Sequence, residues 1–170
     1  MLLGFLLFYV GAVLFLNGLW LMGKIEDREI VVINVVSGLV AGAVVVKGAF
    51  GADASPDSVR AAALTLMFST TYFWVAHNRL VAVDGRGLGW FSLFVAITTV
   101  PVFLRALAMA GGAFEIWLAL NWLIWGVLWF MYFLLLATGR PILNQTAWVT
   151  MISGIVTGWI PGFLLLDGIT

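Results

Sequence analysis

The sequence predicts an all-α integral membrane protein with six transmembrane helices, and composition and the spacing of charges both support that fold class. Hydrophobic residues make up 64% of the 170 positions and charged residues only 9%. A soluble domain carries charge at about a quarter of its positions, so this chain cannot cover its surface with charged side chains. Its surface is therefore expected to face lipid.

Six apolar stretches are each near the ~20 residues that a helix needs to cross a ~30 Å hydrocarbon core. They cover residues 2–22, 30–50, 61–80, 88–109, 114–137 and 145–166. Glycine, proline and charged residues lie between them and predict turns at the water boundary. The first stretch is read as a spanning helix and not as a removable signal peptide. Because the connections are too short to fold separately, we predict a single transmembrane domain over residues 1–170.

Basic residues predict the orientation of the helices. With the N-terminus outside, the inner connections would carry Lys24, Arg28, Arg79, Arg86 and Arg140, and the outer side Lys47, Arg60 and Arg105. This distribution favours both termini on the outer face. The first three helices would then run opposite to the last three, so we also predict an inverted three-helix repeat.

Ionisable residues are missing from the middle of every predicted span. Pumps and proton-coupled transporters need such groups at depth, and intramembrane proteases need metal ligands or paired aspartates. His77, the only histidine, is interpreted as an interfacial residue in preference to a pH-sensitive gate. We therefore predict no enzyme activity and no catalytic, metal-binding or cofactor-binding residues. The net charge of zero gives no reason to expect a nucleic-acid partner.

Uncharged polar and aromatic residues inside the spans are the candidates for a functional site. The polar ones are Asn17, Asn34, Thr70, Thr71, Ser92, Thr98, Thr99, Asn121 and Ser153. Most are expected to hydrogen-bond between helices, and a minority to line a path. Trp122, Trp125 and Trp129 share one helical face, as do Phe68 and Tyr72. Such faces are usually packing surfaces; the alternative is a narrow pore whose rings stack on a planar amide and whose N–H and O–H groups bind it.

Five segments in order carry a family resemblance: residues 9–14 with Asn17, 68–72, 90–101, 122–129 and 159–161. Through them the chain resembles the AmiS/UreI family of bacterial amide and urea channels over nearly its whole length. The resemblance implies six helices with both termini on the outer face of the cytoplasmic membrane. It also implies a pore within each protomer and a homo-hexameric ring.

The resemblance further implies which residues line the pore. They are Leu3, Leu7, Leu14, Phe68, Tyr72, Trp122, Trp125, Leu128 and Trp129. The outermost tryptophan of the family's fifth helix corresponds to Leu118, and the sequence leaves open whether Trp117 replaces it. Acid-gated members have long outer loops with histidines, and buried carboxylates where this chain has Leu135 and Ser153. A channel without proton gating is therefore expected, closer to the amidase-associated AmiS branch, as the inner loop 83–90 also indicates.

The leading hypothesis is a passive channel for small neutral solutes, namely short-chain aliphatic amides such as acetamide, urea, or both. The nearest alternative is a urea channel that supplies a cytoplasmic urease. A proton-coupled amide transporter and a non-conducting membrane scaffold are further alternatives. Expected partners are the neutral solutes, membrane lipids and further copies of the chain, and residue chemistry does not separate urea from acetamide.

Overall fold

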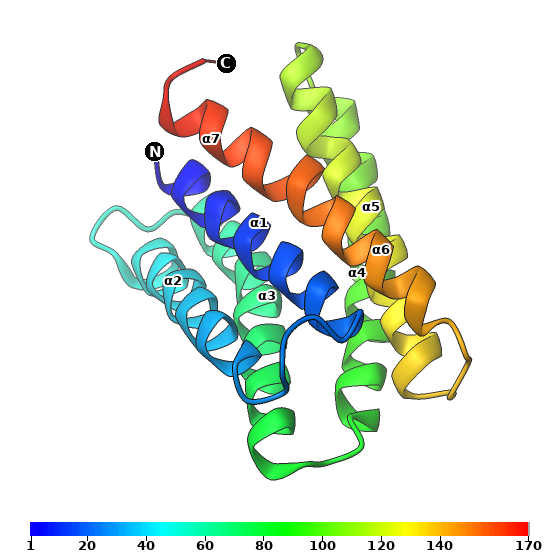
Figure 1. The fold of residues 1–170 in the computed structure, drawn as a ribbon. Helices are drawn as coiled ribbons and strands as arrows, with labels where there is room; N and C mark the ends of the chain where they lie inside the picture. Colours follow the sequence, from blue (N-terminus) through cyan, green and yellow to red (C-terminus); the bar gives the residue numbers. More distant parts are fainter. Residues whose placement is uncertain (170) are drawn as a thin grey trace.

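The computed structural model describes residues 1–169, which are helical apart from their connections (Figure 1). The elements are α1 (Leu2–Leu21), α2 (Ile30–Phe50), α3 (Pro56–Val81), α4 (Arg86–Met109), α5 (Ala113–Leu136), α6 (Leu143–Ser153), η1 (Gly154–Trp159) and α7 (Ile160–Leu166). The last three form one continuous rod in which η1 is a π-helical turn. The described residues thus form six rods, and the predicted fold class is confirmed.

Five of these rods are long and apolar enough to cross a membrane: α1, α2, α4, α5 and the run from Leu143 to Leu166. The sixth, α3, has 26 residues and at 1.5 Å per residue measures about 39 Å. It is less apolar because it turns polar side chains inward, and Ser69, Tyr72 and Asn78 are buried. The sequence therefore predicted this span correctly, although hydropathy alone gives it the weakest support.

The third helix extends beyond the apolar stretch 61–80, because α3 begins at Pro56. Ser55 and Ser58 form a capping box, in which each hydroxyl accepts from the other residue's backbone N–H at 3.2 and 2.8 Å. Such a box pairs backbone donors that the first helical turn leaves free, and proline is favoured at the first position. The charged residues Asp57 and Arg60 therefore lie within the helix.

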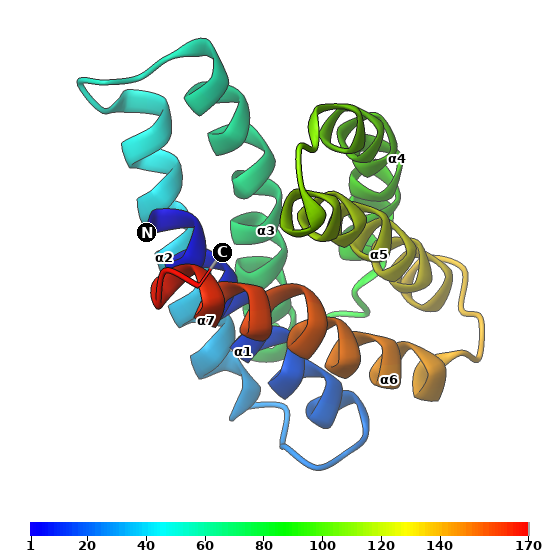
Figure 2. The same cartoon turned by 90° about the horizontal axis from the view of Figure 1, so that it is seen from above.

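The rods pack mainly as three pairs, in which α2 lies against α3, α4 against α5, and α1 against the α6–η1–α7 rod (Figures 1 and 2). Side chains from α1, α3 and α5 supply most of the buried core. Both ends of the chain lie at the same end of the bundle (Figure 1), as six spans require. The inverted relation between the two halves stays a prediction.

Glycines bring α1 and the α6–η1–α7 rod into backbone contact. A Cβ atom added to Gly162 would lie 2.5 Å from the backbone N of Phe8, and one added to Gly154 would lie 2.6 Å from that of Phe15. A Cβ at Gly11 would collide with the backbone of Trp159. Side chains at these positions would therefore force the two rods apart. Small residues commonly allow this kind of close approach between membrane helices.

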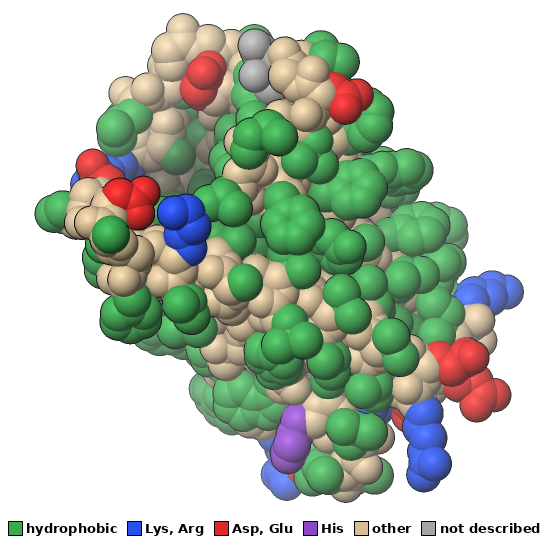
Figure 3. Space-filling view, turned by 90° about the vertical axis from the view of Figure 1, so that its left-hand side faces the viewer, with side chains coloured by type: hydrophobic (Ala, Val, Ile, Leu, Met, Phe, Trp, Pro, Cys, Tyr) green, Lys and Arg blue, Asp and Glu red, His purple; other side chains and the backbone are tan. Residues whose placement is uncertain are grey.

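Charged side chains gather at opposite ends of a largely hydrophobic face (Figure 3). At the end with the termini, Lys47 pairs with Asp53 at 3.6 Å. At the other end, Arg79 pairs with Asp27 at 3.4 Å. Also there, the backbone N–H and guanidinium of Arg86 donate to Asp84 and hold the pKa of that carboxyl below its usual value. The apolar band between two charged ends is what a membrane-spanning bundle requires.

The glycine contact predicts a stability difference between two Gly→Ala variants. Gly11→Ala is expected to lower the free energy of unfolding by about 1–3 kcal/mol, because its methyl group must displace backbone. Gly42→Ala is the matched control, since its Cβ would lie at an ordinary 3.6 Å from Ser69 Oγ. Alanine's higher helix propensity should leave this control at least as stable as the parent. Thermal unfolding in detergent measures both, and equal stability of the two variants would contradict the close contact.

Candidate functional site

Two hollow spaces lie along the bundle between α1 and α5. We call the larger, of about 370 Å³, the vestibule; it is bordered by Leu3, Leu7, Ala106, Met109, Ala110, Glu115, Leu118, Ala119, Asn121, Trp122 and Trp125. We call the smaller, of about 40 Å³, the inner cavity; it is bordered by Leu14, Asn17, Phe68, Thr71, Tyr72, Val75, Leu88, Ser92, Trp125, Leu128, Trp129 and Tyr132. Trp125 borders both spaces.

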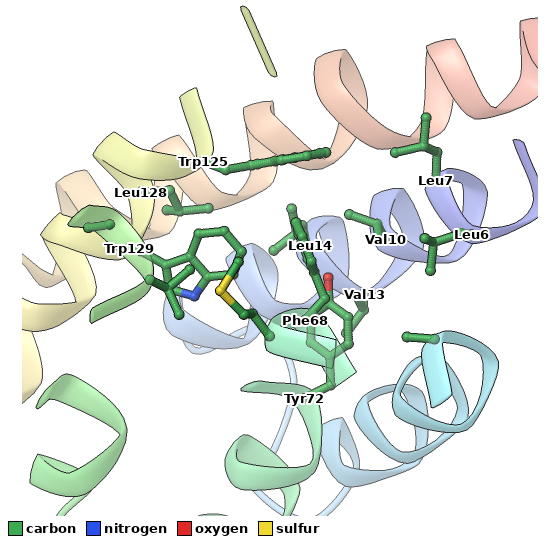
Figure 4. Packing of buried hydrophobic residues seen from close by; sticks show 14 residues of the cluster. Leu6, Leu7, Val10, Val13, Leu14, Phe68, Tyr72, Trp125, Leu128 and Trp129 are labelled. Atoms are coloured by element: carbon green, nitrogen blue, oxygen red, sulfur yellow. The ribbon is translucent and has the colours of Figure 1, made fainter. Parts of the chain in front are cut away.

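Phe68, Trp122, Trp125 and Trp129 form an aromatic cluster whose members border one or both spaces. The ring of Phe68 meets the three indoles edge to face, with centroid distances of 6.1, 4.9 and 4.8 Å respectively. Figure 4 shows Phe68 and Tyr72 reaching from α3 toward Leu14 of α1, with Trp125 and Trp129 on α5. Each such ring pair contributes about 0.5–1.5 kcal/mol beyond burial. The cluster is therefore held together by contacts that are individually weak.

The π-helical turn η1 holds one face of α5 in register. Trp117 donates its indole N–H to the Val156 carbonyl at 3.1 Å. One turn later Asn121 Nδ2 donates to the Thr157 carbonyl at 3.2 Å, and after another turn Trp125 Nε1 donates to Thr157 Oγ1 at 2.7 Å. In a π turn the hydrogen-bond ladder shifts from i+4 to i+5, which leaves carbonyls able to accept from a neighbouring helix.

These hydrogen bonds show that one expectation about Trp125 is wrong and answer the question that the sequence left open about Trp117. The indole N–H of Trp125 is occupied by Thr157, so Trp125 does not offer that donor to a solute as the pore hypothesis assumed. It offers its ring face and edge. Trp117 is turned toward η1 by its own hydrogen bond, whereas Leu118 borders the vestibule. Trp117 therefore does not replace the tryptophan that the family has at the position of Leu118.

The intramembrane polar residues are less often interhelical than the sequence suggested. Asn17 and Asn34 do pair across helices, with Nδ2–Oδ1 distances of 3.2 and 2.7 Å. Most of the hydroxyls instead donate to a carbonyl of their own helix, as Ser92 does to Leu88 at 2.7 Å and Thr98 to Phe94 at 2.8 Å. Serine and threonine side chains reach the carbonyl one turn back without a partner helix, so the expectation is wrong for most hydroxyl residues.

Unpaired polar atoms are few along the two spaces. Within residues 1–169 the buried side-chain atoms without a hydrogen-bond partner are Tyr72 Oη, Asn78 Oδ1 and Asn121 Oδ1. Tyr72 borders the inner cavity and Asn121 the vestibule. Each space is thus bordered by a residue that carries a buried polar atom without a partner. The described part of the chain contains no cluster of three metal-ligating side chains.

All nine residues that the resemblance implied border one of the two spaces. Leu3, Leu7, Trp122 and Trp125 border the vestibule, and Leu14, Phe68, Tyr72, Trp125, Leu128 and Trp129 border the inner cavity. Sequence reasoning singled out Asn121 as polar but did not place it at the site. It gave no role to Thr157, whose only sequence signal is its place between Gly154 and Gly158.

Comparisons with known proteins agree on one family. The profile described as "AmiS/UreI family transporter" matches residues 2–169. A protein of Mycolicibacterium smegmatis, named as an amidate substrates transporter, is 43% identical over 166 residues, which cover 95% of this chain and 75% of the relative. The transporter protein AmiS2 of Rhodococcus erythropolis is 36% identical over 164 residues, covering 95% and 78% respectively.

Helicobacter pylori supplies both a curated relative and a solved structure. Its acid-activated urea channel (strain J99) is 33% identical over 191 residues, covering 96% of each chain. The cryo-EM structure of the H. pylori urea channel in its closed state matches with a TM-score of 0.84 at 33% identity, over 97% of both chains. The higher identity to the mycobacterial and rhodococcal proteins confirms the predicted likeness to the AmiS branch.

The bond between Trp125 and Thr157 predicts a coupled loss of stability. Thr157→Val keeps the shape but leaves a buried indole N–H unpaired, which should cost about 1–3 kcal/mol of unfolding free energy. Thr98→Val is the control, because Thr98 bonds only to its own helix. In a Trp125→Phe background the cost of Thr157→Val should shrink, since no N–H remains to be orphaned. Denaturation followed by circular dichroism measures the cycle, and purely additive effects would contradict the bond.

Proposed function

The chain belongs to the AmiS/UreI family of transporters, and on that premise we propose that it is a passive channel for small neutral amides. The observation that carries the proposal is the pair of spaces, vestibule and inner cavity, whose walls share Trp125 and are bordered by the rest of the aromatic cluster. In this proposal the nine residues implied by the resemblance line the pore. Phe68 and the three tryptophans form its constriction.

Aromatic rings suit the proposed cargo because acetamide and urea are planar and uncharged. A planar amide can slide between ring faces and edges once Phe68 swings aside, which breaks contacts of only about 0.5–1.5 kcal/mol each. A hydrated ion would have to shed its water without receiving charged partners, and that costs far more. Space of about 40 Å³ in the inner cavity limits the passage to very small solutes.

Passive conduction is supported by the side chains around the inner cavity, which are apolar, aromatic, hydroxyl or carboxamide groups. Proton coupling needs a group that changes charge within the path. Glu115 is the carboxylate on the wall of the vestibule; it lies in the first turn of α5 and is exposed. We infer that an exposed carboxylate at the mouth does not gate the constriction below it, so the channel works without proton gating.

The preferred solute is proposed to be a short-chain amide, with urea also conducted. The relative of higher identity is named for amidate substrates and the more distant one for urea. A urea channel serving a urease is the second candidate, because both solutes fit the same ring geometry. The chain is a multi-pass membrane protein, and we propose a homo-hexamer in the cell membrane with both termini on the outer face.

Solute flux into liposomes tests the proposed function. Stopped-flow light scattering under inward gradients of acetamide and of urea should show faster uptake than empty vesicles, with acetamide at least as fast as urea. The rates should change little between neutral and mildly acidic pH. A steep acid activation that Glu115→Gln abolishes would contradict the ungated channel, and absence of any acceleration by folded protein would contradict conduction altogether.

Shortening Phe68 tests the constriction. Phe68→Leu removes the ring that meets all three tryptophans, so a bulkier neutral solute such as glycerol should enter several-fold faster than through the parent. Phe94→Leu is the matched control, because Phe94 is 60% exposed on the lipid face. The same assay measures both variants after their folding is checked. Equal glycerol rates in the two variants would remove Phe68 from the path.

A further inference from the structure

We propose that the carboxamide oxygen of Asn121 selects solutes by accepting their N–H groups at the vestibule side of the aromatic cluster. The inference rests on the proposed channel function and adds that the site distinguishes solutes by their N–H groups. A preference for primary amides and urea would then come from one hydrogen-bond acceptor, while the aromatic rings select for small, planar solutes.

Asn121 is placed for this role by its neighbours on α5. It borders the vestibule together with Trp122 and Trp125, which follow it by one and four residues along the helix. Trp125 continues on to border the inner cavity. A solute in the vestibule therefore lies beside Asn121 as well as beside the rings of the two tryptophans.

The orientation of the Asn121 side chain is fixed by η1. The Thr157 carbonyl can only accept a hydrogen bond, so the amide group must turn its nitrogen toward it, at 3.2 Å. The oxygen then has no partner, although the residue is 0% exposed. The same turn occupies the indole N–H of Trp125. The turn η1 thus occupies the Trp125 donor and leaves the Asn121 acceptor unpaired.

An unpaired buried acceptor is costly, typically by about 1–3 kcal/mol, and a leucine at this position would avoid the cost. A passing amide N–H removes it by donating to Asn121 Oδ1. A solute without N–H groups leaves the oxygen unpaired. Sites built to hydrogen-bond a particular group reject analogues that lack it more strongly than apolar pockets reject extra bulk.

Three planar amides with five heavy atoms each separate N–H donation from size. Propionamide has two N–H groups, N-methylacetamide one and N,N-dimethylformamide none. Their rates in proteoliposomes, after subtraction of the rates in empty vesicles, should fall in that order for the parent. Asn121→Leu should lower the ratio of propionamide to N,N-dimethylformamide by about tenfold, which corresponds to about 1.4 kcal/mol. Asn121→Gln, which keeps the carboxamide, should restore part of the ratio.

The outcomes distinguish this inference from the channel proposal. If no solute enters faster than in empty vesicles, the channel itself is wrong. If all three amides are accelerated equally by the parent, Asn121 does not select for N–H groups, and this result needs no variant that folds. If Asn121→Leu is folded and conducting but keeps the parent ratio, the discrimination arises elsewhere and the role of Asn121 is overturned.

Discussion

The close contact between α1 and the α6–η1–α7 rod is the constraint on which the rest of the bundle depends. It exists only because glycines such as Gly11 and Gly158 face each other, where any Cβ atom would meet backbone. Lipid offers no hydrophobic drive for helices to associate, so packing at this distance must supply the attraction. Leu7 and Leu14, four residues before and three residues after Gly11, flank this contact on α1 and border the two spaces.

The π turn η1 in turn fixes the position of α5 through hydrogen bonds. Because Thr157 lies between glycines that contact α1, η1 cannot move away without breaking that contact. Its carbonyls and hydroxyl then fix Trp117, Asn121 and Trp125 along a single stripe of α5. The adjoining face of α5 carries Trp122 and Trp129 toward Phe68. The position of the aromatic cluster thus follows from a contact two helices away.

Sequence reasoning found the faces of the helices but not their partners. The spacing of Trp122, Trp125 and Trp129 predicts one helical face, and the structure places all three around Phe68. The sequence did not reveal the π turn, because such a turn is defined by its backbone hydrogen bonds and requires no particular residues. Sequence reasoning could not foresee that Thr157 occupies the Trp125 N–H. The hydroxyl residues were misjudged because backbone carbonyls of the same helix compete with neighbouring helices.

The low polarity of the two spaces bears on how the proposed channel would work. A conducting path must bind its solute strongly enough to replace lost water and weakly enough to release it. Polar groups such as the unpaired oxygens of Asn121 and Tyr72 compensate only part of an amide's hydration, while ring contacts supply the remainder without directionality. A denser array of donors and acceptors would hold the amide longer. Few polar groups on either side of a weakly held aromatic gate therefore favour rapid transit over tight binding.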